Sequence, residues 1–433
     1  MKYTIGDKVK VKTKDKSYTG VVMPTPELAD KDVLILKLAN GYNIGIRITK
    51  DTQIKKIGEV KLKGLPEYKP KINPKLPNVS VISTGGTITS RVDYKTGAVY
   101  PLEKPEELLL SIPELIDIIN IRQIKQPFTL LSEDMAPKQW QKIAEEAAIL
   151  LNSDDVGLII THGTDTLHYT AAALSFMLKN VSKPIALVGG QRSSDRGSFD
   201  GALNLICAAH YCKSDLAGVS VVMHGESSDT FCYAHRGTKV RKLHTSVRNA
   251  FHTVNDIPLA KIFKDGKIKI LNKNHKQRFD HHAETILDNK FEPKTALVKY
   301  HPGANPDILN HYIKNKYKGI VIEATGLGHV ATQPIDKKDS WLPVIKKAVD
   351  KGIAVCFTPQ TLYGRLQPHV YRTARLLQKA GVIYLQDMLP ETAYVKLGWV
   401  LGHTTKPDEV KKKMLTNIAG EINPKLQPNS VLK

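Results

Sequence analysis

Long apolar segments are missing from this chain of 433 residues. No window approaches the roughly 18 consecutive apolar residues that are needed to cross a bilayer. The first eight residues, Met1 to Lys8, also lack the apolar stretch of a signal peptide. We therefore expect a cytoplasmic protein with no membrane contact.

Cysteine is scarce, and its four positions form no recognisable site. Cys207, Cys212, Cys232 and Cys356 include no Cys-x-x-Cys pair, and no histidine spacing matches them. This pattern indicates neither a zinc site nor a disulfide framework. We expect free buried thiols and no metal.

Acidic residues are outnumbered, with 42 Asp and Glu against 63 Lys and Arg and a net charge of +21. Residues 1–77 hold 17 Lys and Arg against 8 Asp and Glu, so a small part of the chain carries nearly half of the surplus. A basic surface attracts polyanions such as nucleic acids. A generally basic proteome would give the same charge, and charge alone does not separate the two.

Residues 1–56 are expected to form a small basic β-barrel-like domain. Short alternating runs occur at 8–12, 18–22, 33–36 and 42–48, with turn residues between them. A linker is expected over residues 57–77, where Pro66, Pro70, Pro74 and Pro77 favour an extended backbone.

From Asn78 the pattern changes to buried strands that alternate with amphipathic helices, which indicates an α/β fold with a doubly wound, mainly parallel sheet. The apolar runs lie at 79–83, 156–160, 184–188, 219–223, 296–298, 320–322 and 353–357. We expect a larger α/β domain with the active site at 78–290 and a smaller α/β domain at 291–433.

Ligands of such sheets bind beyond the carboxyl ends of the strands, so the residues after each run are candidates for a site. The first candidate is Thr84-Gly85-Gly86-Thr87, where two glycines allow a tight turn and Thr87 presents a hydroxyl. A threonine nucleophile needs a base and a group that stabilises the oxyanion. A plain turn with Thr87 as a helix cap is the alternative.

The second candidate is the run from Thr161 to Thr166, which holds Asp165 between Thr164 and Thr166. Asp165 could simply cap a helix that begins near Leu167, although a cap does not explain the whole polar cluster. His162 is interpreted as a structural loop residue.

The third candidate is the basic run from Arg236 to Thr245. A lysine that is desolvated or lies beside other cations can lose its proton and act as a base. A solvated face is the alternative for this run.

Together the three places resemble the asparaginase/glutaminase family, from Asn78 to about Ile418. The resemblance implies that Thr87 is the nucleophile and that Thr164 and Asp165 act with it. The family's lysine lies nine residues before a phenylalanine, and Phe251 therefore selects Lys242 over Lys239.

The same resemblance implies four substrate-binding residues. Ser132 and Glu133 match groups that hold the amino-acid end of the substrate, and Gly190 matches an oxyanion N–H. Tyr100 matches the tyrosine of a mobile loop, with Tyr94 as the alternative.

Within that family the basic domain and linker resemble the D subunits of archaeal tRNA-dependent amidotransferases, as do the runs 90–94, 241–246 and 387–391. This resemblance implies a glutaminase that supplies ammonia to an E-type subunit for the conversion of Glu-tRNA(Gln) to Gln-tRNA(Gln). ATP and Mg would bind to that partner. Consistent with this, the sequence contains no Gly-x-x-x-x-Gly-Lys-Ser/Thr phosphate-binding loop, and we expect no cofactor in this chain. A homodimer within a heterotetramer is implied.

Three alternatives stay open. The first is a stand-alone asparaginase or glutaminase, and the second is a non-catalytic nucleic-acid-binding protein. The third is a dinucleotide-binding protein, because residues 325–331 contain a Gly-x-Gly-x-x-Ala pattern. The acidic residue expected after the next strand is missing, since that strand runs into Thr358 and Pro359.

Overall fold

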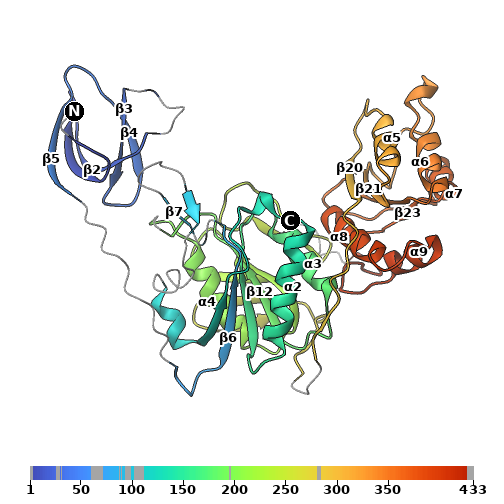
Figure 1. Cartoon of the computed structure of the whole chain (residues 1–433), viewed down its shortest axis with the longest axis horizontal. Coiled ribbons are helices and arrows are strands. Elements are labelled where there is room, and N and C mark those ends of the chain that lie inside the picture. Colours follow the sequence, from blue (N-terminus) through green and yellow to red (C-terminus); the bar gives the residue numbers. More distant parts are fainter. Residues whose placement is uncertain are drawn as a thin grey trace.

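The computed structural model consists of three parts in a row, with a small sheet at one end, a large α/β domain in the centre and a small α/β domain at the other end (Figure 1). It describes residues 3–25, 30, 32–59, 72–86, 88, 90–92, 99–101, 112–194, 197–279 and 284–426.

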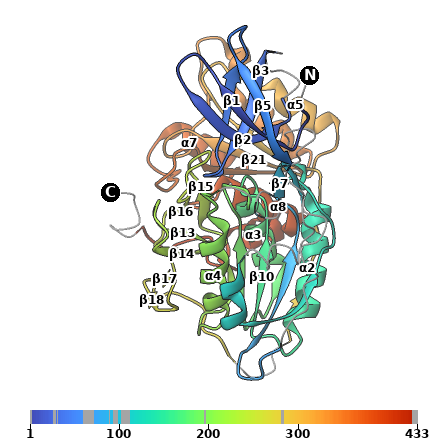
Figure 2. The same ribbon diagram turned by 90° about the vertical axis from the view of Figure 1, so that its left-hand side faces the viewer.

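The first part is all-β, as predicted. Its five antiparallel strands have the order β4-β3-β2-β1-β5. The sheet lies at the opposite end of the molecule from the smaller α/β domain (Figure 1), and in the view along the long axis it lies in front of that domain (Figure 2). The strands are β1 (Asp7–Lys12), β2 (Ser17–Met23), β3 (Val33–Leu38), β4 (Asn43–Arg47) and β5 (Gln53–Glu59). In β1 buried residues alternate with exposed lysines, so Val9 and Val11 join a small core with Val22 and Leu36.

The fifth strand was not among the predicted runs. Residues 60–71 of the predicted linker lie outside the described residues, so the linker stays a prediction. β5 continues to Glu59, three residues past the predicted end of the domain. Its two isoleucines, Ile54 and Ile57, are separated by Lys55 and Lys56 and show no alternation. The strand forms because β1 offers a free edge, along which Val11 pairs with Ile54.

The central part contains an eight-stranded sheet with the order β18-β17-β14-β13-β12-β10-β6-β9. The strands are β6 (Asn78–Ser83), β9 (Asn120–Lys125), β10 (Gly157–Thr161), β12 (Pro184–Val188), β13 (Gly218–His224), β14 (Phe231–Arg236), β17 (Ala260–Phe263) and β18 (Ile268–Ile270). The strands from β9 to β13 are parallel, and the three beyond β13 are antiparallel. The predicted, mainly parallel sheet is confirmed.

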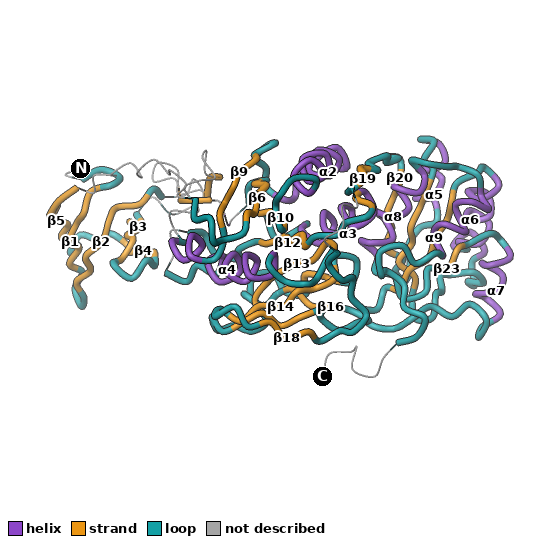
Figure 3. Tube along the Cα trace, turned by 90° about the horizontal axis from the view of Figure 1, so that it is seen from below, coloured by secondary structure: helices purple, strands orange, loops and turns teal. Residues whose placement is uncertain are grey.

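Helices cover both faces of this sheet, as a doubly wound fold requires. Figures 1 and 3 show α4 on one face and α2 with α3 on the other. The helical segments are η2 (Pro113–Asp117), η3 (Ser132–Asp134), α2 (Pro137–Leu151), α3 (Leu167–Met177) and α4 (Gly201–Cys212). Each face has its own hydrophobic cluster.

Short two-stranded ladders lie around the central sheet. They pair β7 (Ser90–Val92) with β8 (Val99–Pro101), β11 (Leu178–Lys179) with β19 (Ile286–Leu287), and β15 (Val240–Lys242) with β16 (Phe251–Thr253).

The third part has a parallel four-stranded sheet with the order β20-β21-β22-β23. Its elements are β20 (Thr295–Lys299), α5 (Asp307–Lys314), β21 (Gly319–Ala324), η4 (Lys337–Asp339), α6 (Trp341–Asp350), β22 (Ala354–Pro359), α7 (Arg372–Lys379), β23 (Ile383–Tyr384), α8 (Pro390–Leu401) and α9 (Pro407–Leu415). Helix α8 packs against α3 of the central domain, and both helices belong to one hydrophobic cluster.

None of the helices in the described ranges is long and apolar enough to cross a membrane. All four cysteines are free and buried, as predicted.

Candidate active site

Loops that follow the parallel strands β6 and β10 meet at the carboxyl edge of the central sheet. The backbone N–H and the hydroxyl of Thr84 both donate to the carbonyl oxygen of Thr161, at 3.1 and 2.9 Å. Two residues after Thr84, a Cβ on Gly86 would lie less than 3.0 Å from Cα and N of Gly163. Because Gly86 also has a φ of 84°, only glycine fits this contact without strain.

Thr87, the predicted nucleophile, lies outside the described residues. Its neighbours on both sides are described: Gly86 touches Gly163, and Ile88 is fully buried. The position of Gly86 therefore places the start of the nucleophile loop against the loop that carries Thr164 and Asp165. The role of Thr87 stays a prediction.

Lys242 joins Thr164 and Asp165 into one cluster. Its ammonium group donates to Thr164 Oγ1 at 2.9 Å and to Asp165 Oδ1 at 2.6 Å. The Lys242 side chain is 9% exposed, whereas the side chain of Asp165 is 66% exposed. A lysine in contact with a buried hydroxyl can exchange a proton with it, while the exposed carboxylate is available to a ligand.

This geometry bears on the alternatives for two of the predicted residues. Asp165 does not cap α3, because the N-cap is Thr166 and it makes no side-chain cap bond. Lys239, the other candidate lysine, is fully buried and donates to Asp387 Oδ2 at 2.7 Å. The basic run is thus not a solvated face at this residue, and only Lys242 of the two lysines contacts Thr164.

Ser132 lies beside the same cluster, in the short helix η3. Its hydroxyl accepts a hydrogen bond from the backbone N–H of Asp165 at 3.3 Å, and its carbonyl accepts one from Thr166 Oγ1 at 2.6 Å. A Cβ on Gly163 would lie 2.7 Å from Ser132 Cβ. Ser132 is buried and Glu133 is exposed, so the two predicted binding residues border the loop of Asp165.

Gly190 follows β12, the next strand of the sheet, and faces the nucleophile loop. A Cβ at this position would lie 3.4 Å from Ile88 Cβ. The next two backbone N–H groups, of Gln191 and Arg192, donate to the carboxylate of Asp200 at 3.0 and 2.9 Å. Asp200 therefore fixes the turn that carries Gly190, whose oxyanion role stays a prediction.

The loop tyrosine is not decided by the structure. The backbone of Tyr100 belongs to β8, where it pairs with Arg91 of β7. Tyr94 lies outside the described residues, and so both tyrosines stay as predictions.

His162 has a structural environment, in line with its interpretation. Its Nδ1–H donates to the carbonyl of Gly163 at 2.7 Å, and its Nε2 accepts from the hydroxyl of Thr170 at 2.8 Å. Burial lowers the pKa of His162 to about 4, so the ring is neutral near neutral pH.

Three further residues lie in the wall of the site, and none of them was assigned a role there from the sequence: Arg241 and Glu391 belong to runs named above, whereas no pattern pointed to His168. His168, Arg241 and Glu391 line a cleft together with Asp165 and Lys242. Arg241 Nε lies 2.9 Å from Glu391 Oε1, and burial raises the pKa of Glu391 while Arg241 opposes this effect. Burial, aided by Arg241 and Lys242, lowers the pKa of His168 to about 3.

Within the described ranges, no group of three or more His, Cys, Asp and Glu side chains is arranged to hold a metal ion. The Gly-x-Gly-x-x-Ala run is a closed turn, in which the N–H of Thr325 donates to the carbonyl of His329 at 2.9 Å. The ring of Tyr384 fills the space beside Gly328, and the next α-helix begins only at Trp341. A dinucleotide fingerprint opens directly into a helix, which this turn does not do.

Three family models match the chain. The model of the N-terminal asparaginase domain matches residues 78–276, and that of the glutaminase/asparaginase C-terminal domain matches residues 294–414. The model of the GatD N-terminal domain matches residues 3–57.

Solved structures define the class. The thermostable L-asparaginase from Thermococcus kodakarensis superposes with a TM-score of 0.70 at 29% identity, over 80% of this chain and 100% of that one. L-asparaginase I from Vibrio cholerae gives a TM-score of 0.68 at 26% identity, over 80% and 99% of the two chains. The two α/β domains are therefore those of an asparaginase-type protein, as the resemblance implied.

Curated relatives narrow this class. The D subunit of the glutamyl-tRNA(Gln) amidotransferase from Pyrococcus furiosus is 54% identical over 99% of this chain and 97% of its own length. That of Methanopyrus kandleri is 48% identical over 97% of this chain and 92% of its own length. The chain belongs to the family of glutamyl-tRNA(Gln) amidotransferase D subunits.

Proposed function

We propose that this chain is the glutaminase subunit of a tRNA-dependent amidotransferase and that it hydrolyses the side-chain amide of glutamine with Thr87 as the nucleophile. The observation that carries this proposal is the contact of Lys242 with both Thr164 and Asp165, next to the loop that begins at Gly86. The identity of 54% to a D subunit over nearly the whole chain supports the choice of reaction.

The reaction is an acyl transfer in two halves. Thr87 Oγ attacks the carboxamide carbon while its proton passes through the hydroxyl of Thr164 to Lys242, which takes part in this step as the neutral amine, and the N–H of Gly190 stabilises the oxyanion. The C–N bond then breaks, the nitrogen takes up the proton, and ammonia leaves. Water hydrolyses the resulting ester by the same proton relay, which releases glutamate and restores Thr87.

Binding of the amino-acid end uses the polar groups around η3. The exposed carboxylate of Asp165 pairs with the substrate's ammonium group, and Ser132 and Glu133 hold the rest of that end. The loop tyrosine, Tyr100 or Tyr94, closes over the substrate. One methylene separates glutamine from asparagine and is worth only about 1–3 kcal/mol in such a pocket, so both amides belong in the assay.

Ammonia passes in this proposal to an E-type subunit, which activates the glutamate of Glu-tRNA(Gln) with ATP and Mg and forms the new C–N bond. The complex is a heterotetramer built on a homodimer of this chain, and it acts in the cytoplasm. The match of residues 3–57 to the GatD N-terminal domain, together with the names of the relatives, supports the pairing with a second amidotransferase subunit.

The test is release of glutamate and ammonia from glutamine, by the chain alone and with its partner subunit and charged tRNA. We expect Thr87→Ala and Lys242→Met to lower kcat at least about 100-fold, since each removes a group of the proton-transfer step. Lys269→Met, which removes an exposed lysine of β18, serves as the control.

The L-asparaginase structures favour one second candidate, a stand-alone asparaginase or glutaminase. Fast turnover of asparagine that does not respond to the partner or to tRNA would support it and would contradict the amidotransferase.

A further inference from the structure

Two ion pairs connect the segment that carries Lys242 to the other α/β domain. Among the described strands β15 pairs only with β16, and it does not belong to the eight-stranded sheet that positions Thr164 and Asp165. Two cations precede Lys242 on this segment, and both form ion pairs with carboxylates at or just before the start of α8. Lys239 Nζ lies 2.7 Å from Asp387 Oδ2, and Arg241 Nε lies 2.9 Å from Glu391 Oε1.

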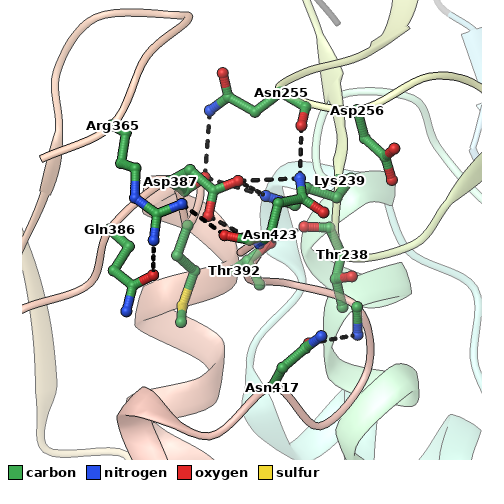
Figure 4. A network of polar contacts seen from close by, with 12 residues as sticks. Thr238, Lys239, Asn255, Asp256, Arg365, Gln386, Asp387, Thr392, Asn417 and Asn423 are labelled. Atoms are coloured by element: carbon green, nitrogen blue, oxygen red, sulfur yellow. Dashed lines mark hydrogen bonds and ion pairs between the residues drawn. The ribbon is translucent and has the colours of Figure 1, made fainter. Parts of the chain in front are cut away.

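The first pair is the fully buried centre of a polar network (Figure 4). The side chains of Lys239 and Asp387 are both 0% exposed. The lysine also donates to the carbonyl of Asp387 at 3.2 Å, and the carboxylate accepts from N and Nδ2 of Asn423, each at 3.1 Å. Burial lowers the pKa of Lys239, and the charge of Asp387 opposes this effect. A buried charge with this many partners has one stable position.

Backbone strain marks the same network. Asn255 and Gln386 have φ values of 57° and 60°, which residues other than glycine rarely adopt. Asn255 Nδ2 donates to the carbonyls of Gly364 and Asp387 at 3.1 and 3.3 Å, and the side chain of Gln386 accepts from Arg365. Strained residues persist where their surroundings define the conformation strongly. The segment that holds Lys239 is therefore rigid.

The second pair lies at the rim of the candidate site. Arg241 directly precedes Lys242, and Glu391 lies in the first turn of α8. Both residues line the cleft that contains Lys242 and Asp165. Because Lys242 is only three positions from Lys239 and one from Arg241, the two ion pairs restrict where the ammonium group of Lys242 can lie.

We propose that Asp387 and Glu391 are positioning residues for Lys242, so that the smaller domain sets the distance between Lys242 and Thr164. This inference rests on the proposed glutaminase function. It assigns a part in the proton relay to a domain that contributes none of Thr87, Thr164, Asp165 or Lys242. Misplacement of a catalytic group by about 1 Å can cost on the order of 100-fold in rate.

The decisive variant is Glu391→Gln, which keeps the side-chain length and removes the charge. We expect kcat for glutamine to fall at least about tenfold, with KM changed by less than about twofold, because the residues that bind the amino-acid end are untouched. The charge-swapped variant Arg241→Glu with Glu391→Arg should recover part of kcat.

The matched control is Asp155→Asn. Arg122 Nε lies 2.8 Å from Asp155 Oδ1, with side chains 31% and 1% exposed, against 23% and 8% for Arg241 and Glu391. Asp155 precedes β10 at the opposite edge of the sheet, so its loss should lower the melting temperature and leave kcat unchanged. Equal kcat values for the two variants, at a temperature where both are folded, would overturn the inference.

The buried pair gives an independent test. Asp387→Asn leaves the ammonium of Lys239 without its counter-charge, and a further Lys239→Met should restore much of the lost stability. A positioning role requires kcat to stay low in this stable double variant, whereas recovery of kcat together with stability would indicate a purely structural pair. Wild-type chain with its partner subunit is assayed first: no glutamine turnover there would contradict the proposed function itself.

Discussion

The backbones of Gly86 and Gly163 touch where the loops after β6 and β10 meet, with no room for a Cβ on Gly86. These two glycines join the segment that leads to Thr87 with the segment that holds Thr164 and Asp165. The geometry of the whole candidate site therefore depends on a contact that no side chain makes.

Gly86→Ala should destabilise the chain by about 3 kcal/mol, through overpacking against Gly163 and the strain of a non-glycine residue at a φ of 84°. Glutaminase activity should be lost as well, because the next residue is Thr87. The control is Gly303→Ala, with a φ of 78° and no atom within 4 Å of the added Cβ. Urea unfolding should show a loss of about 1 kcal/mol there, and equal losses would contradict this explanation.

Buried histidines predict the dependence of stability on pH. The folded pKa of His162 is about 4, against an ordinary value of 6.5. Between these pH values the unfolded chain binds a proton that the folded chain does not, so stability is lost as pH falls from 6.5 towards 4 and is unaffected above 6.5. The loss from His162 is about 3 kcal/mol when complete.

Unfolding by urea from pH 7 to pH 5 measures this effect. His162→Gln should lower stability at pH 7 and flatten its decline with falling pH, whereas His369→Gln, which replaces an exposed histidine, should leave the decline unchanged. If the free energy of unfolding of His162→Gln falls as steeply with pH as that of the wild type, groups other than His162 dominate this pH dependence.

Exposed lysines of the small β domain lead to a prediction about whether this domain binds RNA. Lys10 of β1 lies directly opposite Lys55 of β5, and Lys8 and Lys12 flank Lys10 on the same exposed face. Like charges in this arrangement destabilise a sheet unless an anion neutralises them. If RNA is that anion, replacing Lys8, Lys10 and Lys55 by Gln should weaken tRNA binding and reduce the slope of log K against log salt by up to about three.

The control is Lys411→Gln with Lys412→Gln on the exposed face of α9, which removes two positive charges away from this domain, against three in the β-domain variant. An unchanged salt slope for the β-domain variant would indicate that the domain contacts protein instead of RNA.

The sequence predicted those parts of the fold that depend on local pattern. Continuous apolar runs such as 184–188 became the central parallel strands because a strand buried on both faces has no polar position to interrupt it. The polar residues after such strands met as expected, and Lys242 reached Asp165 across 77 positions of sequence. The parallel order of β6, β10 and β12 brings the loops after these strands to one edge of the sheet.

Features that depend on distant partners could not be predicted. Ile54 and Ile57 show no strand pattern alone, and β5 exists because β1 accepts it. Glu391 resembles any acidic residue in the first turn of a helix, and only the packing of α8 on α3 brings it to Arg241. Lys239 likewise looked like a surface lysine, since its counter-charge Asp387 lies 148 positions away.

Helix α8 shares one hydrophobic cluster with α3. Leu397 and Val400 of the smaller domain are fully buried there with Leu174 and Met177 of the larger one. A cut of the chain near residue 290 would expose this apolar surface on both fragments. Because the two α/β domains share this buried surface, we expect them to unfold together.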